Sequence, residues 1–125
     1  GHERIHLIDP VDVEEMHNLI SRCYMVMTDS GGLQEEAPAL GKPVLVMRRE
    51  TERPEAIAAG TAKLAGVEKD EIVRLANELL DDPAAYAKMA KAVNPYGDGR
   101  ASERIVQAIL WHFGRAPEKP ADFQT

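Results

Sequence analysis

The 125-residue sequence contains one cysteine, no basic run and no long apolar stretch. The lone thiol of Cys23 excludes an internal disulfide and suits a reducing compartment, where we expect it to be a core residue. Because 21 acidic residues outweigh 15 basic ones, the net charge of −6 argues against a nucleic-acid partner. No stretch of about 18 apolar residues and no signal-like segment is present, so we expect a cytoplasmic chain with no membrane partner. His6, His17 and His112 lack the paired spacing of a metal site, and no metal or cofactor is predicted.

The sequence does contain the hydrophobic content of a globular domain, 44%, arranged as alternating strands and helices. Asp12 and Glu15 have the spacing of a capping box and open an amphipathic helix. The chain begins at Gly1 and soon reaches an expected strand, which favours a piece of a longer protein or a tag remnant. The alternation predicts an α/β fold with a parallel sheet and right-handed crossovers. The expected strands are 4–9, 24–28, 44–47 and 61–65, and the first helices are 12–23 and 33–40.

The carboxyl-terminal half reads as mostly helical. Pro54 is expected to start a short helix that ends before Gly60. Asp70 is expected to cap the next helix, with Ile72, Val73, Leu75, Ala76, Leu79 and Leu80 on its buried face. Asp82-Pro83 starts another helix, and 100–113 forms the last one, with Ile105, Val106, Ile109, Leu110 and Phe113 as its apolar positions. We therefore expect a domain over residues 1–113 and a tail over 114–125.

One stretch, residues 28–38, carries the clearest chemical signal. A strand that turns through Gly31-Gly32 into a helix leaves unpaired N–H groups at the positive end of the helix dipole, which is where phosphates bind. Ser30 adds a side-chain donor, and Glu36 is an acceptor suited to two ribose hydroxyls. The alternative is a tight turn in which Ser30 is an N-cap and no ligand binds. Spacing alone leaves both interpretations open.

Three motifs in order resemble one known family: TDSGGLQEEAPALGKPVLVMR, TERPEAIAAGT and NPYGDGRASERI. They are similar to the carboxyl-terminal part of non-hydrolysing UDP-N-acetylglucosamine 2-epimerases, over about Ile5 to Leu110. The resemblance implies a Rossmann-like parallel sheet flanked by helices, one partial half of a two-domain GT-B architecture. It also implies interconversion of UDP-GlcNAc and UDP-ManNAc, an isomerisation that inverts the carbon bearing the acetamido group through elimination of UDP to a glycal and its re-addition.

The resemblance assigns roles to six residues. Ser30, Gly31 and Gly32 match the diphosphate-binding turn, Glu36 the ribose acceptor, and Arg53 an arginine near the diphosphate and sugar. Arg53 has the alternative of a surface ion pair with Glu50 or Glu55. Met16 falls where an aromatic side chain often lines the uridine pocket; its thioether still covers a ring face, although periodicity alone makes it a core residue. The family's acid/base residues lie in segments absent here, so no catalytic residue is predicted.

Several alternatives remain open at this stage. The chain is expected to be the UDP-binding portion of an epimerase, inactive alone and completed by a missing amino-terminal domain. A donor-binding domain of a GT-B glycosyltransferase and a stand-alone nucleotide-sugar binding module are the other candidates. The family's second domain has two further strands ahead of Ile5, so an open apolar edge also predicts self-association as a homo-oligomer.

Overall fold

Three short parallel strands form the centre of the fold. They are β1 (Val26–Thr28), β2 (Val44–Val46) and β3 (Ala62–Leu64), in the spatial order β1-β2-β3. In the computed structural model, which describes residues 1–124, Val26 pairs with Val44, and Val44 pairs with Ala62. The predicted parallel sheet is therefore confirmed, with each strand a little shorter than its apolar segment.

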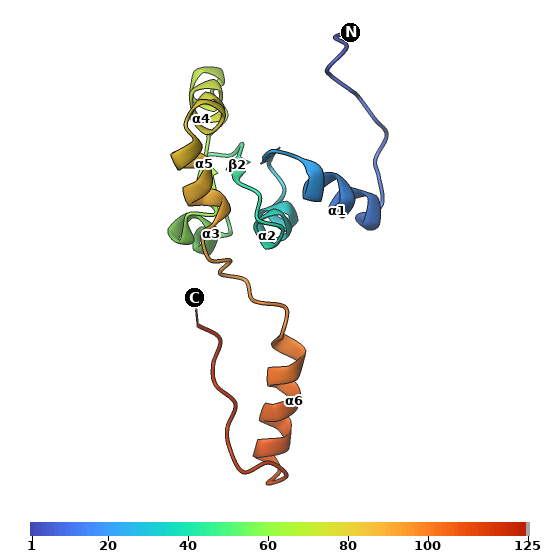
Figure 1. The fold of residues 1–125 in the computed structure, drawn as a ribbon, viewed down its shortest axis with the longest axis vertical. Coiled ribbons are helices and arrows are strands. Elements are labelled where there is room, and N and C mark those ends of the chain that lie inside the picture. Colours follow the sequence, from blue (N-terminus) through green and yellow to red (C-terminus); the bar gives the residue numbers. More distant parts are fainter. Residues whose placement is uncertain (125) are drawn as a thin grey trace.

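Helices cover both faces of this sheet. In Figure 1, α4 and α5 stand on one side of β2, and α2 and α1 stand on the other. Because neighbouring strand residues point in opposite directions, Val44 and Val46 pack in a cluster with α1, α2 and α3, while Leu45 packs in a second cluster with α4 and α5. The helices are α1 (Val13–Arg22), α2 (Gly31–Ala39), α3 (Pro54–Ala59), α4 (Lys69–Asp81), α5 (Pro83–Ala90) and α6 (Ala101–His112).

Most helix boundaries follow the predicted local signals. Asp12 caps α1 by accepting a hydrogen bond from the backbone N–H of Glu15 at 2.8 Å. Pro54 is the first residue of α3, and Gly60 ends it in the left-handed conformation, with φ of +83°. Asp82 caps α5 through the backbone N–H of Ala84 at 2.9 Å. None of the helices in residues 1–124 is long and apolar enough to cross a membrane.

Three predictions about elements are wrong. Residues 4–9 form no strand: they run away from the sheet beside α1, where no neighbouring strand offers a backbone ladder (Figure 1). Asp70 does not cap α4, because the helix already begins at Lys69 and Glu68 is the N-cap residue. On α4, Leu75 and Leu79 are buried, whereas the predicted core residues Val73 and Leu80 are exposed.

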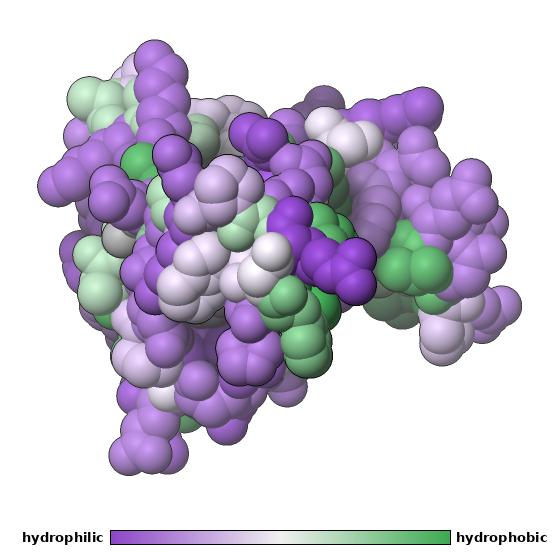
Figure 2. Space-filling model, turned by 90° about the horizontal axis from the view of Figure 1, so that it is seen from below, coloured by the Kyte–Doolittle hydropathy of each residue, from purple (hydrophilic) through white to green (hydrophobic). Residues whose placement is uncertain are grey.

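The last helix projects from the rest of the molecule. Figure 1 shows α6 extending away from the sheet, with the chain after Gly114 returning alongside it. Figure 2, which views the molecule from this end, shows hydrophobic side chains at the surface among hydrophilic ones. The apolar side chains predicted for α6 are all exposed: Ile105, Val106, Ile109, Leu110 and Phe113. The division between a domain over 1–113 and a tail over 114–125 stays a prediction.

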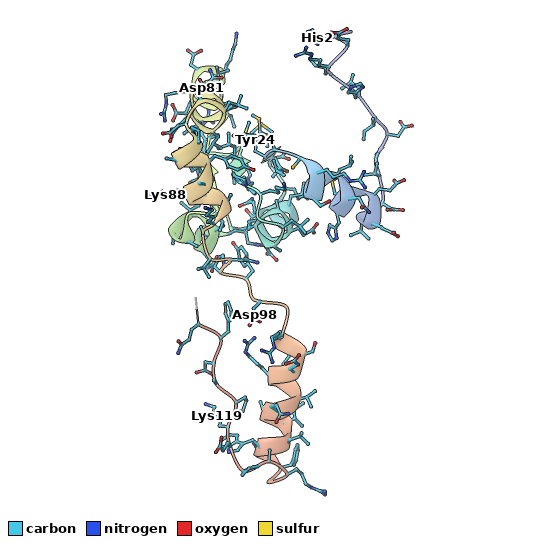
Figure 3. All side chains as sticks on the ribbon, in the orientation of Figure 1. His2, Tyr24, Asp81, Lys88, Asp98 and Lys119 are labelled. Atoms are coloured by element: carbon cyan, nitrogen blue, oxygen red, sulfur yellow. The ribbon has the colours of Figure 1, made fainter. Side chains whose placement is uncertain are left out.

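A pair of tyrosines fastens the α4–α5 layer to the start of the first strand. The rings of Tyr24 and Tyr86 stack with centroids 4.3 Å apart. The Tyr24 hydroxyl donates to the carbonyl of Leu79 at 2.9 Å, and the Tyr86 hydroxyl donates to the carbonyl of Tyr24 at 2.7 Å. Figure 3 shows Tyr24 reaching from the strand side toward these helices. Tyr24 precedes β1, so these contacts lie at the amino end of the strand, opposite the turn that follows Thr28.

Candidate functional site

The turn between β1 and α2 lies at the carboxyl edge of the sheet, where parallel α/β proteins bind ligands. β1 ends at Thr28 and α2 begins at Gly31, so only two residues connect them. Ser30 is the N-cap: its hydroxyl accepts from the N–H of Leu33 at 3.5 Å, and its own N–H donates to Thr28 Oγ1 at 3.0 Å. The N–H groups of Gly31 and Gly32 have no partner within the helix, because the first turn of a helix lacks one, and this is what an anion site requires.

Two carboxylates border the glycines of this turn. A Cβ on Gly31 would stand 2.5 Å from Glu52 Oε1 and 3.7 Å from Arg53 Nη2. A Cβ on Gly32 would stand 3.5 Å from Glu36 Oε1 and 3.9 Å from the Ser30 hydroxyl. Glycine at position 31 thus permits the close approach of a charged group to the backbone. The structure brings Ser30, both glycines, Glu36 and Arg53 together at one end of α2.

A buried polar contact joins this turn to the loop after β2. Gln34, which is fully buried, donates from Nε2 to the Ser30 carbonyl at 3.2 Å. The Thr51 hydroxyl donates to Gln34 Oε1 at 2.5 Å and accepts from the Arg53 N–H at 3.0 Å. Sequence reasoning missed Gln34 and Thr51. The available signal was a polar residue one helical turn after Ser30, on a face that is otherwise apolar.

Arg53 forms an ion pair, but not with the predicted partners Glu50 or Glu55. Its Nε donates to Oε1 of Glu35, and this hydrogen bond raises the pKa of Arg53. Arg48 Nη1 pairs with Glu52 at 2.6 Å. The pKa of Glu52 is lowered, first by its own backbone N–H and then by the nearby Arg48 guanidinium. The edge of the sheet therefore carries alternating positive and negative groups around the helix start.

Glu36 and Met16 connect the turn to α1. Glu36 Oε2 lies 3.0 Å from His17 Nε2, with both side chains about half exposed. Met16, the neighbour of His17, is half-buried and packs against the core cluster that contains Ile20 and Ala37. Cys23 also packs against that cluster, and burial raises the pKa of its thiol. The uridine-facing role of Met16 stays a prediction.

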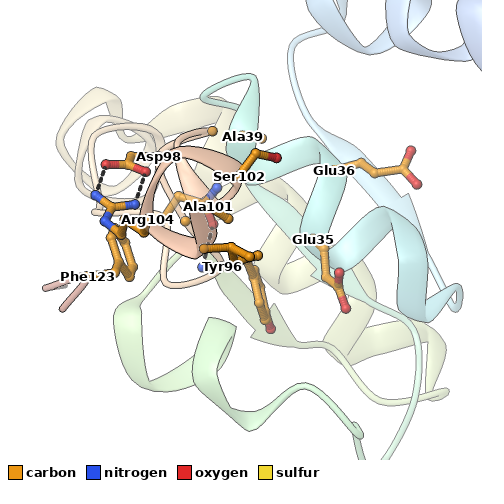
Figure 4. Close-up of a pocket in the computed structure, with 13 residues that line it drawn as sticks. Glu35, Glu36, Ala39, Tyr96, Asp98, Ala101, Ser102, Arg104 and Phe123 are labelled. Carbon is orange, nitrogen blue, oxygen red and sulfur yellow. Dashed lines mark hydrogen bonds and ion pairs between the residues drawn. The ribbon is translucent and has the colours of Figure 1, made fainter. Parts of the chain in front are cut away.

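A pocket of about 610 Å³ opens between α2 and the start of α6. Figure 4 shows Glu35 and Glu36 projecting in different directions from α2, with Tyr96 to the left of Glu35. The Arg104 guanidinium donates to both oxygens of Asp98, at 2.8 and 2.6 Å, and holds the pKa of that carboxyl well below its usual range. Burial raises the pKa of Tyr96. Residues 1–124 contain no group of three His, Cys, Asp or Glu side chains placed to hold a metal ion.

The strand order and the short Ser-Gly-Gly turn define a Rossmann-like α/β domain, and the helix start after that turn has the geometry of an anion site. The model of the UDP-N-acetylglucosamine 2-epimerase family matches residues 1–110, so the chain belongs to this family. The expected family resemblance and fold class are confirmed.

Three similar proteins support this assignment. A protein of Thermotoga maritima is 66% identical over 121 residues, which cover 97% of this chain and 32% of that protein. A crystal structure from Listeria monocytogenes superposes with a TM-score of 0.95 at 54% identity, covering 100% of this chain and 33% of that one. The UDP-GlcNAc 2-epimerase of Neisseria meningitidis, solved with UDP-GlcNAc bound, has a TM-score of 0.82 at 51% identity, covering 85% of this chain and 29% of that one. The chain thus spans about a third of the length of these relatives.

Proposed function

We propose that this chain is the UDP-binding carboxyl-terminal portion of a UDP-N-acetylglucosamine 2-epimerase. The observation that carries the proposal is the helix start at Ser30, Gly31 and Gly32, with Arg53 on one side and Glu36 on the other. The backbone N–H groups of the turn and the Arg53 guanidinium are suited to a diphosphate. The Glu36 carboxylate is suited to ribose hydroxyls, because an ionised carboxylate accepts hydrogen bonds and donates none.

In the proposed reaction, UDP and the proton on the carbon bearing the acetamido group leave as the glycal forms. UDP then adds back to the carbon that it left, and a proton returns to the opposite face of the acetamido-bearing carbon. UDP must therefore stay bound while its bond to the sugar is broken, which gives this domain a part in the chemistry as well as in affinity. We propose that the acid/base residues lie in the amino-terminal domain or early in the second domain, in segments that this chain does not contain. The proposed partners are the amino-terminal domain, a second copy of the chain and a UDP-sugar. We place the protein in the cytoplasm.

Calorimetric titration of the chain with UDP, CMP and inorganic phosphate tests the proposal. We expect UDP to bind most tightly. Because a hydrogen bond to a charged group contributes about 1.5–3 kcal/mol, Glu36→Ala should weaken UDP binding on the order of tenfold or more and should not weaken phosphate binding. Glu14→Ala, on the exposed side of α1, is the matched control. Equal affinity for UDP and phosphate would contradict the assignment of Glu36 to the ribose. Absence of binding by either ligand would contradict the whole proposed site.

The two alternative functions predict different results. A stand-alone binding module binds UDP-sugars and leaves them unchanged even when the amino-terminal part of a relative is added. A GT-B donor domain supports sugar transfer to an acceptor instead of forming UDP-ManNAc. The family match over residues 1–110 favours the epimerase.

A further inference from the structure

His17 and Glu36 meet across two helices. They are 19 residues apart in the sequence, and His17 Nε2 lies 3.0 Å from Glu36 Oε2. An ionised carboxylate has no proton to donate, so the imidazole Nε2 carries the hydrogen and donates it.

The helices themselves fix where this contact occurs. Asp12 sets the start of α1 by capping it, and Met16 and Ile20 anchor the helix in the core cluster. Buried Ala37, the residue after Glu36, fixes α2 in the same cluster. Both side chains thus extend from helices whose rotation is set by packing, as a preorganised site requires.

The two carboxylate oxygens of Glu36 face different groups. Oε2 faces His17, whereas Oε1 lies 3.5 Å from the position that a Cβ added at Gly32 would take, and the Ser30 hydroxyl lies 3.9 Å from the same position. A free glutamate side chain samples many rotamers, and a ligand that needs one of them loses affinity in selecting it. With one oxygen held by His17, the other already faces the turn.

We infer that His17 is a positioning residue for nucleotide binding, which holds the Glu36 carboxylate in the orientation that accepts the ribose hydroxyls. This inference rests on the proposed function. Surface ion pairs often contribute nothing measurable to stability, so the role is visible in ligand affinity rather than in unfolding. In this role His17 acts through Glu36.

The test measures the affinity for UDP and for 2′,3′-dideoxy-UDP, which lacks the ribose hydroxyls. Both ligands are titrated into the wild-type chain and four variants: His17→Ala, His17→Gln, Glu36→Ala and the His17→Ala/Glu36→Ala double variant. Ordering a side chain of this kind changes affinity about twofold to tenfold, and we expect His17→Ala to weaken UDP binding by that factor. Binding of the dideoxy ligand should not change. His17→Gln, which keeps an N–H donor, should recover part of the loss, and His17→Ala should add nothing on the Glu36→Ala background.

Three results would overturn the inference while leaving UDP binding intact. They are unchanged UDP affinity in His17→Ala, an equal loss for both ligands, and a full additional loss on the Glu36→Ala background. His112→Ala, in the last turn of α6, controls for loss of a histidine as such. Failure of the wild-type chain to bind UDP would instead overturn the proposed function, and this inference with it.

Discussion

The carboxylate of Glu52 occupies the approach to Gly31, where the proposed diphosphate binds. Its pKa lies below the ordinary value, so it is ionised at neutral pH and repels an incoming anion. Arg48 holds it there at 2.6 Å. The arriving phosphate must displace this side chain toward solvent.

Glu52→Gln should therefore bind inorganic phosphate and UDP more tightly than the wild-type chain, by roughly twofold to fivefold at low salt. The gain should shrink as salt is added, because exposed charges are screened. It should also vanish as the pH falls through the pKa of Glu52, where the wild-type carboxylate becomes neutral. Titrations at two salt concentrations check this, with exposed Glu14→Gln as the control. Weaker binding in Glu52→Gln would mean that Glu52 assists the ligand rather than competes with it.

At the scale of elements, the link between α2 and the loop after β2 depends on Thr51. Thr51→Val keeps the side-chain shape but leaves the buried Gln34 Oε1 without its donor. An unsatisfied buried acceptor costs about 1–3 kcal/mol, and we expect the free energy of unfolding to fall by that amount. Urea unfolding measures it, and Thr51→Ser, which keeps the hydroxyl, should lose much less. Equal stability of both variants would contradict the importance of this contact.

Local signals predicted most helix boundaries, although Asp70, expected as a cap, lies inside α4. Asp12, Pro54, Gly60 and Asp82 act on backbone groups within a few residues, and the structure places all four at helix boundaries. The prediction of a strand over residues 4–9 was wrong because a strand needs backbone hydrogen bonds to a neighbouring strand. The apolar residues of the segment do not indicate whether such a neighbour is present.

The candidate site also has a part that local sequence predicts and a part that it does not. Ser30 and the two glycines form one local turn, so their spacing was sufficient to predict it. The pairing of Glu35 with Arg53 and of His17 with Glu36 joins residues 18 and 19 positions apart. Such contacts depend on how helices pack across the sheet, which the order of the residues does not specify.

At the scale of the whole molecule, we expect the chain alone not to epimerise UDP-GlcNAc. Inverting the carbon needs one group to remove a proton and another to return it, each contributing about 10²–10⁴-fold. Glu35, Glu36 and Glu52 are each paired with a cationic or imidazole side chain. An assay for UDP-ManNAc, with the chain alone and with the amino-terminal part of a relative added, checks this. Turnover by the chain alone would place the chemistry in this domain.

The exposed apolar side chains also predict self-association. Ile5, Leu7 and Ile8 are largely exposed in the amino-terminal segment, and the apolar positions of α6 are exposed as well. Contiguous apolar surface favours contact with another chain. Light scattering over a range of concentrations should show a mass that rises above 13.8 kDa. Replacing Leu7, the most exposed of the three, with Ser should lower the association; a constant monomer mass would contradict the prediction.

The central claim is that the start of α2 holds the diphosphate of UDP. Its most direct test is a nitrogen-15 chemical-shift titration of the assigned chain with UDP. We predict that the largest shifts occur at the backbone N–H groups of Gly31, Gly32 and Leu33, with smaller ones at Glu36 and Arg53. Inorganic phosphate should move the three turn signals but not Glu36. Shifts concentrated in the pocket around Asp98 and Arg104, with the turn unmoved, would contradict the account.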